Sequence, residues 1–199
     1  ANTFAAEVHQ QSPGSSDMVF GLKIEALIVT NSAADAGVMI NEVLADNSSL
    51  AELGGATPDW IELYNPSTAA IDLTGMSLSD NNLVPTRWVF PAGSLLAGQA
   101  FLRIAFSADI PVSATNTGFG LAANGGAVFL FNKPSDGGTL QSSIAYGLQA
   151  ANWSIGRVPD GTTNWPLTVP SLGASNIIAT LGSPQSLKIN EWMADPASG

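Results

Sequence analysis

The sequence contains no cysteine, few charged residues and a single histidine. Without thiols, disulfide bonds, thiol catalysis and cysteine-based zinc sites are all excluded. Only 11% of the 199 residues are charged, and 16 acids against 6 bases give a net charge of −10. This balance argues against nucleic acid or an anionic membrane as a partner, because both attract basic surfaces. His9 lies far from the main group of predicted strands, which therefore lacks the histidine of a Ser/His/Asp triad.

Long apolar runs are absent as well, since no stretch approaches the 18 apolar residues of a membrane-spanning helix. The chain is instead 45% hydrophobic with 20 glycines and 12 prolines, which suits strands separated by turns. No long helical pattern occurs, and residues 46–58 are expected to be a loop with at most one helical turn. This spacing predicts an all-β sandwich or barrel. The expected strands are near 38–44, 59–65, 71–79, 86–90, 100–106, 127–132, 139–146 and 153–157.

A repeated motif indicates how the chain is divided. Ile40-Asn41-Glu42 recurs as Ile189-Asn190-Glu191, about one domain length later, which is typical of a tandem array. An isolated hairpin is marginal in water, so we expect at least one end segment to dock on a sheet edge, in its own body or in a strand-exchanged dimer. The expected parts are an N-terminal pair of strands at 1–30, a linker at 31–37, the body at 38–176, a linker at 177–186 and the first strand of a second repeat at 187–199.

The body resembles the lamin tail domain. The resemblance rests on the Ile40-Asn41-Glu42 motif, the Asp59–Asn65 and Ile71–Asp80 segments and the Gly156–Gly161 segment, in that order. It implies an immunoglobulin-like β-sandwich over 38–176. The N-terminal strands are similar to the end of a galactose-binding-like jelly roll, so the whole chain is expected to carry an extra N-terminal β-hairpin.

The resemblance also implies a function. Such domains occur in bacterial surface and secreted proteins, so we expect an extracellular or cell-surface location. The predicted function is a non-catalytic interaction or spacer module of a large multidomain protein, contacting neighbouring domains, another protein or a glycan. No enzyme activity and no cofactor are expected. The alternative is an accessory carbohydrate-binding module of a secreted hydrolase.

Two glutamates inside apolar strands are the first candidates for chemistry. Paired carboxyl groups such as Glu42 and Glu62 can serve glycoside hydrolysis. The structural interpretation is that they meet an arginine or cap nearby amides, with Arg157 as the expected ion-pair partner. Together with Asn65 these residues form the predicted structural polar cluster.

Loop acids and tryptophans give two further hypotheses. Asp46, Glu52, Asp59 and Asp80 would supply oxygen ligands for calcium if they gathered, although the sequence has no D-x-D-x-D-G loop. Among the tryptophans, Trp165 lies in a predicted loop and is the best candidate for a recognition surface. Trp60 lies on the strand face opposite Ile61 and Leu63, so one of these faces is expected to be partly exposed. The full set is Trp60, Trp88, Trp153, Trp165 and Trp192.

Overall fold

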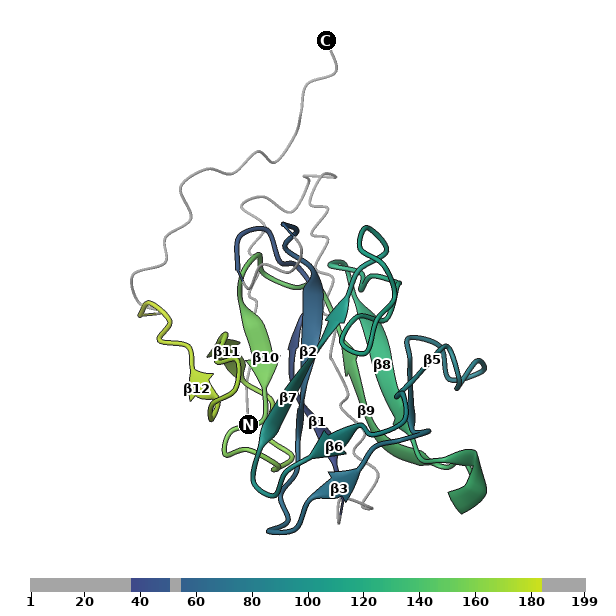
Figure 1. Ribbon diagram of the computed structural model, residues 1–199. Helices are drawn as coiled ribbons and strands as arrows, with labels where there is room; N and C mark the ends of the chain where they lie inside the picture. The colour runs from purple at the N-terminus through teal and green to yellow at the C-terminus, as the bar shows by residue number, and fades with distance from the viewer. Residues whose placement is uncertain (1–36, 51–54, 184–199) are drawn as a thin grey trace, which may run out of the picture. The chain divides into compact units, whose positions relative to one another are not determined.

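The computed structural model describes residues 37–50 and 55–183, which are almost entirely strands and turns (Figure 1). The one helical element in these ranges is a 3-10 turn at Pro134–Asp136. The all-β fold class is therefore confirmed. Within the same residues, no helix is long and apolar enough to span a membrane. The predicted end segments at 1–30 and 187–199, their docking, and most of the predicted helical turn lie outside the described residues.

Two antiparallel sheets form the sandwich, and a two-stranded ribbon of β3 (Ile71–Asp72) and β6 (Leu95–Leu96) accompanies them. The larger sheet has the strand order β12-β11-β10-β1-β2-β7 (Figure 1). The smaller sheet has the order β5-β4-β8-β9. The strands of the larger sheet are β1 (Met39–Leu44), β2 (Asp59–Tyr64), β7 (Phe101–Phe106), β10 (Ser154–Gly156), β11 (Leu167–Val169) and β12 (Ile177–Ile178). Those of the smaller sheet are β4 (Ser77–Ser79), β5 (Trp88–Val89), β8 (Gly126–Phe131) and β9 (Leu140–Tyr146).

The core lies between the inner faces of the two sheets. Alternation along β2 sends Ile61 and Leu63 into this core, where they join Leu78 of β4 and Leu130 of β8. Burying each such side chain is worth roughly 1.5–3 kcal/mol. Aromatic pairs fill the remainder, including Trp88 with Phe90 and Phe106 with Phe119, both edge-to-face.

A bulge in β1 decides which residues face away from the core. The register of β1 on β2 shifts between Ile40 and Glu42. Ile40 and Val43 both lie in the core, so Glu42 falls on the outer face of the sheet. On β2, Glu62 lies on that same outer face because its neighbours Ile61 and Leu63 point inward.

The predicted strand at 71–79 is two strands in the structure, β3 and β4. Gly75 between them has φ 79°, a left-handed conformation that suits glycine. Its amide donates to Phe90 O at 3.0 Å, and the amide of Met76 donates to Leu73 O at 2.9 Å, which closes a turn. The other predicted strands are observed within a few residues, whereas β6, β11 and β12 were not predicted.

Residues 170–176, here called the strap, connect β11 to β12 across the outer face of the larger sheet. Ser171 and Gly173 contact Glu42 of β1 and Glu62 of β2. Asn176 ends the strap, and its side-chain amide donates to Asn41 O and Arg157 O, both at 3.0 Å. The strap therefore closes over the two glutamates that the sequence singles out.

Candidate functional site

The outer face of the larger sheet carries a buried pair of carboxyl groups. Glu42 and Glu62 are direct partners in the register of β1 on β2, and both are 0% exposed. Side chains opposite one another on antiparallel strands lie close together, and like charges there repel. The local sequence explains their position, since the bulge in β1 turns Glu42 to the face that Glu62 already occupies.

Each carboxyl group accepts hydrogen bonds from neighbouring backbone and hydroxyl groups. Glu42 accepts from Ser154 Oγ at 2.7 Å, from Ser171 N at 3.2 Å and from Ser171 Oγ at 3.1 Å. Glu62 Oε2 accepts from Gly173 N at 2.5 Å. Within the part of the chain that the structure describes, Glu62 Oε1 is buried and has no hydrogen-bond partner.

Burial dominates the acid–base behaviour of this pair. Desolvation raises the pKa of Glu42 to about 7, although hydrogen bonds from Ser154 and Ser171 act in the opposite direction. Desolvation likewise raises the pKa of Glu62 to about 8, and the negative charges of Glu42 and Asp160 add to the effect. At neutral pH the pair therefore holds at least one proton in the folded domain.

Among the ion pairs of the described residues, the predicted one between Arg157 and these glutamates is not found. Its Nε donates to Ile40 O at 2.8 Å and its Nη1 donates to Thr162 O at 2.6 Å. The guanidinium carbon also lies 4.9 Å from the centre of the Trp165 ring. The guanidinium is thus directed at backbone carbonyls and an aromatic face, while serine hydroxyls and strap amides contact the carboxyl groups.

Asn65 lies at a different corner of the fold, just after β2. Its side-chain amide donates to Ala69 O, Leu96 O and Ala97 O at 2.8, 3.1 and 3.0 Å. Its Oδ1 accepts from the amide and the hydroxyl of Ser67. The four residues expected to form one polar cluster therefore occupy three places: the glutamate pair, the Arg157 stack and the Asn65 corner.

The acids that were considered as calcium ligands have different partners in the structure. Asp59 accepts from Asn47 N at 3.1 Å and Leu121 N at 3.3 Å, and desolvation raises its pKa, with a further contribution from Asp46. Asp80 forms an ion pair with Arg87. Glu52 lies outside the described residues. Among the residues that are described, no group of three or more acids, histidines or cysteines is arranged to hold a metal ion.

A family model described as the Lamin Tail Domain matches residues 31–147. This span is more than half of the chain. The chain belongs to the lamin tail domain family. Domains of this family are immunoglobulin-like and are generally non-catalytic protein-interaction modules. No curated protein and no solved structure matches the chain.

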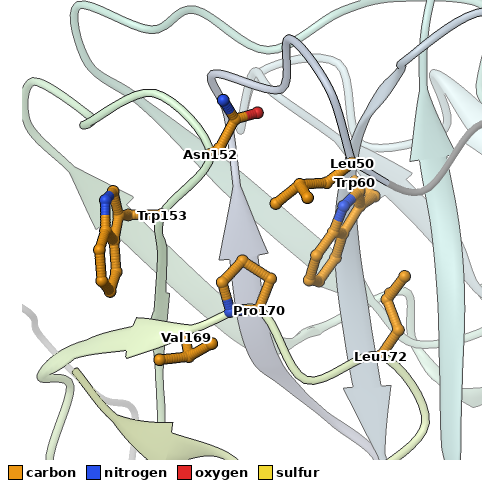
Figure 2. A pocket seen from close by; sticks show the side chains of 7 residues that line it. All are labelled: Leu50, Trp60, Asn152, Trp153, Val169, Pro170 and Leu172. Atoms are coloured by element: carbon orange, nitrogen blue, oxygen red, sulfur yellow. The ribbon is translucent and has the colours of Figure 1, made fainter. Parts of the chain in front are cut away.

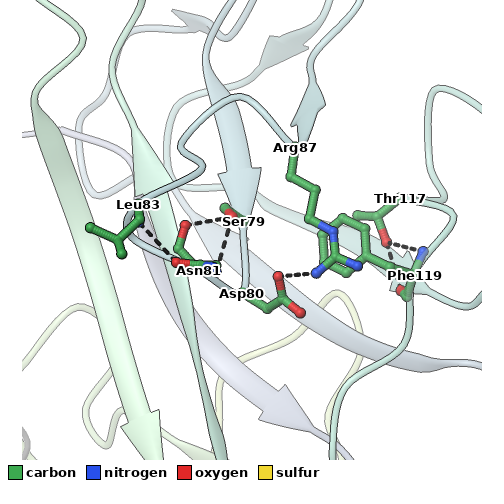
Figure 3. Close-up of polar contacts among 7 residues, drawn as sticks. All are labelled: Ser79, Asp80, Asn81, Leu83, Arg87, Thr117 and Phe119. Atoms are coloured by element: carbon green, nitrogen blue, oxygen red, sulfur yellow. Dashed lines mark hydrogen bonds and ion pairs between the residues drawn. The ribbon is translucent and has the colours of Figure 1, made fainter.

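In this lamin tail domain the loop after β4 is held in place by its own polar groups (Figure 3). Ser79 Oγ accepts from Asn81 N at 3.0 Å, and Asn81 Oδ1 accepts from Leu83 N at 2.9 Å. Arg87, paired with Asp80, lies over the Phe119 ring at 3.9 Å. These contacts leave Leu83 at the loop tip highly exposed. Asp80 therefore serves loop geometry in this structure.

The exposure of the tryptophans in the lamin tail domain differs from the prediction. Trp60 is 0% exposed, and Leu50, Pro170 and Leu172 lie beside it on the outer sheet face (Figure 2). Trp165 is half-buried and packs against the core. Trp153, which the sequence did not single out, is the most exposed of those described, at 37%. Trp192 lies outside the described residues.

Trp60 and Trp153 line one open pocket of about 360 Å³. Figure 2 shows Trp153 and Trp60 flanking Pro170, with Leu50 and Asn152 above. Asn152 is held at the rim because its Oδ1 accepts from the amides of Ser48 and Ser49. Among the residues that the structure describes, no charged side chain lines this pocket. It is mainly an apolar surface, and its only signal in the sequence is the adjacent pair Asn152-Trp153.

Replacing Arg157 with lysine is expected to destabilise the domain by about 2 kcal/mol. Lysine has one compact ammonium group and cannot serve two carbonyls in different directions while also stacking on Trp165. Urea unfolding followed by tryptophan fluorescence measures the loss. Arg87→Lys is the matched control, because that arginine also stacks on an aromatic ring but its polar partner is the exposed acid Asp80 and not a pair of backbone carbonyls, and it should cost about 0.5 kcal/mol or less. Equal losses for both variants would contradict this role of Arg157.

Proposed function

We propose that this domain is a non-catalytic interaction and spacer module of a large secreted or cell-surface multidomain bacterial protein. Family membership supports the interaction role. Only 11% of the residues are charged, against about 25% in typical soluble domains, and we associate such small polar surfaces with exported modules. The recurrence of Ile40-Asn41-Glu42 at 189–191 supports a tandem arrangement in the parent protein.

One surface carries the proposal for protein contacts. Trp153, Val169, Leu172 and Ile177 are apolar and exposed, Ile177 at 63%. The first three line the same pocket, and Val169 is the register partner of Ile177, so the four are neighbours. We call these four side chains the apolar face. Contiguous exposed apolar side chains on a soluble domain mark sites of protein contact.

The proposed partner is a neighbouring domain of the same parent protein. An inter-domain contact of this kind is small and partly polar, which suits an apolar face bordered by serine and asparagine. The complete open reading frame is the first test, since it must contain further domains and an export signal. A reading frame without either would contradict the proposal.

Removing apolar side chains from this face should weaken binding to the neighbouring domains at least tenfold. The variant is Val169→Ser with Ile177→Ser, and the adjoining regions of the parent protein are supplied as a separate chain and titrated by calorimetry. Val89→Ser with Leu95→Ser is the matched control, because those strand residues are similarly exposed in β5 and β6. A loss of about 1 kcal/mol of binding free energy for each of the two contact residues gives the expected weakening of at least tenfold. No measurable binding by the unaltered chain, or equal weakening by the control, would contradict the protein-contact role.

A carbohydrate-binding accessory module is the second candidate, and the pocket between Trp60 and Trp153 is the observation that favours it. Sugar rings stack on exposed aromatic faces. Trp60 is buried, so Trp153 offers the accessible face. A fluorescence titration with soluble polysaccharides distinguishes the two functions. Saturable binding that Trp153→Ala abolishes would favour the glycan role, and its absence with every polysaccharide would favour the protein contact.

A further inference from the structure

Three residues of the strap hold it in place, and two of them contact buried acids of the sheet. Ser171 bonds to Glu42, and Gly173 bonds to Glu62. Asn176 is the third, because its side-chain amide contacts two backbone carbonyls and its backbone amide donates to Asp160 Oδ1 at 3.1 Å. The strap itself, Pro170-Ser171-Leu172-Gly173-Ala174-Ser175-Asn176, contains no titratable side chain. Any change of charge at the strap therefore comes from the acids that it contacts, which are Glu42 and Glu62 of the sheet and Asp160 beyond β10.

The Ser171 hydroxyl has one hydrogen and several acceptors within reach. Its Oγ lies 3.1 Å from Glu42 Oε2, 3.2 Å from Ala174 O and 2.9 Å from Asn176 Oδ1. A hydroxyl donates one hydrogen and can accept another. A protonated Glu42 can donate to Ser171, which then donates to Asn176. An ionised Glu42 instead draws the Ser171 hydrogen to itself, and the amide oxygen of Asn176 loses its donor.

Glu62 favours the neutral form for a related reason. Its Oε2 accepts from Gly173 N, but among the described residues its buried Oε1 has no partner. A buried carboxylate oxygen without a donor is costly, whereas a neutral acid carries far less charge on that oxygen.

Three further charged groups lie near the pair. Asp160, beyond β10, is a third acid, and its Oδ1 accepts from Asn41 Nδ2 and from Asn176 N. Arg157 is directed to Ile40 O and Thr162 O. On β7, Arg103 is the register partner of Glu62. The negative charge of Asp160 raises the pKa of both Glu42 and Glu62.

We propose that Glu42 and Glu62 form a proton-controlled latch for the strap. The strap lies on the sheet while the pair holds at least one proton, and it lifts when both carboxyl groups are ionised. Two adjacent negative charges beside Asp160 are then relieved by water entering beneath Ser171 and Gly173. Pro170 and Leu172 line the same pocket as Trp60, so lifting of the strap also exposes this tryptophan (Figure 2).

The direction of the pH dependence follows from the two acids. The pKa of Glu42 is about 7 and that of Glu62 about 8 in the folded domain, both above the ordinary value of 4.5. The seated strap is therefore favoured below pH 7, and its seating is lost as the pH rises through 8.

Amide hydrogen exchange of the intact 199-residue chain, followed by NMR, tests the latch. After correction for intrinsic exchange rates, the protection factors of the Ser171 and Gly173 amides should fall at least tenfold between pH 6 and pH 9. The amides of Ile61 and Leu63 in the centre of the sheet should change less than threefold over the same range. Denaturant unfolding at each pH separates this local opening from global unfolding.

Glu62→Gln is the decisive variant. Glutamine keeps an oxygen for the Gly173 amide and stays neutral, so the tenfold loss of protection should disappear. Asp109→Asn removes one exposed acid distant in sequence and should behave like the unaltered chain. Protection that does not change with pH in the unaltered chain would overturn the latch whether or not the variant folds. An equal loss of protection in Glu62→Gln would overturn it as well.

Discussion

Asn65→Asp is expected to destabilise the domain by about 4 kcal/mol. The substitution preserves the size of the side chain and replaces one amide NH2 group by an oxygen. Three backbone carbonyls, of Ala69, Leu96 and Ala97, converge on that group and would each lose their donor. An ionised aspartate would repel them, and a neutral one would satisfy a single carbonyl at most. Urea unfolding at pH 7 measures the change.

The Asn65 corner leaves little room for adjustment. The Gln99 amide donates to both Asn65 O and Ser67 O at 2.9 Å, which joins the two turns. A Cβ added to Gly98 would lie 2.2 Å from Thr68 O, so the backbones are in contact there. Asn124→Asp makes the same chemical change at an exposed turn and should cost less than about 0.5 kcal/mol. Similar losses at both positions would mean that the corner does not depend on the Asn65 amide.

The strands with strong apolar alternation were predictable from sequence. Ile61 and Leu63 in β2 alternate with polar or large residues, and the structure sends both into the core. The lamin tail domain family was predictable from ordered motifs and is confirmed over residues 31–147. The strands β11 and β12 were not predictable. They contain three and two residues, too few to show a period, and β12 is exposed at both positions.

The site was predicted only in part, because its arrangement depends on the strap. Alternation correctly placed Trp60 opposite Ile61, but alternation alone could not reveal that Pro170 and Leu172 reach this face. The same strap supplies the amides that contact Glu42 and Glu62, so the expected arginine was not needed there. The prediction of an ion pair between an acid and a base of the sequence assumes that the acid stays ionised when it is buried. Here desolvation favours the neutral acid, and the serine hydroxyl of Ser171 serves in place of a cation.

The stability of the whole domain should fall by about 3 kcal/mol between pH 6 and pH 9. The folded-state pKa values of Glu42 and Glu62, about 7 and about 8, exceed the ordinary value of 4.5. The folded state therefore binds more protons than the unfolded state in this range, and stability decreases as the pH rises. Each pKa unit corresponds to about 1.4 kcal/mol. Lifting of the strap limits this loss of stability, because water then reaches the two ionised carboxyl groups and they no longer have to stay buried.

Glu62→Gln should reduce that loss of stability to about 1 kcal/mol, because Glu42 is then the one acid of the buried pair that loses a proton between pH 6 and pH 9. The variant should match the unaltered chain at pH 6 and exceed its stability at pH 9 by about 2 kcal/mol. Urea unfolding at both pH values gives the comparison, and His9 cancels because both proteins contain it. Asp109→Asn should show the full loss. A variant that loses as much stability as the unaltered chain would mean that Glu62 is ionised throughout this range, and the buried pair would then need a cation to stabilise it.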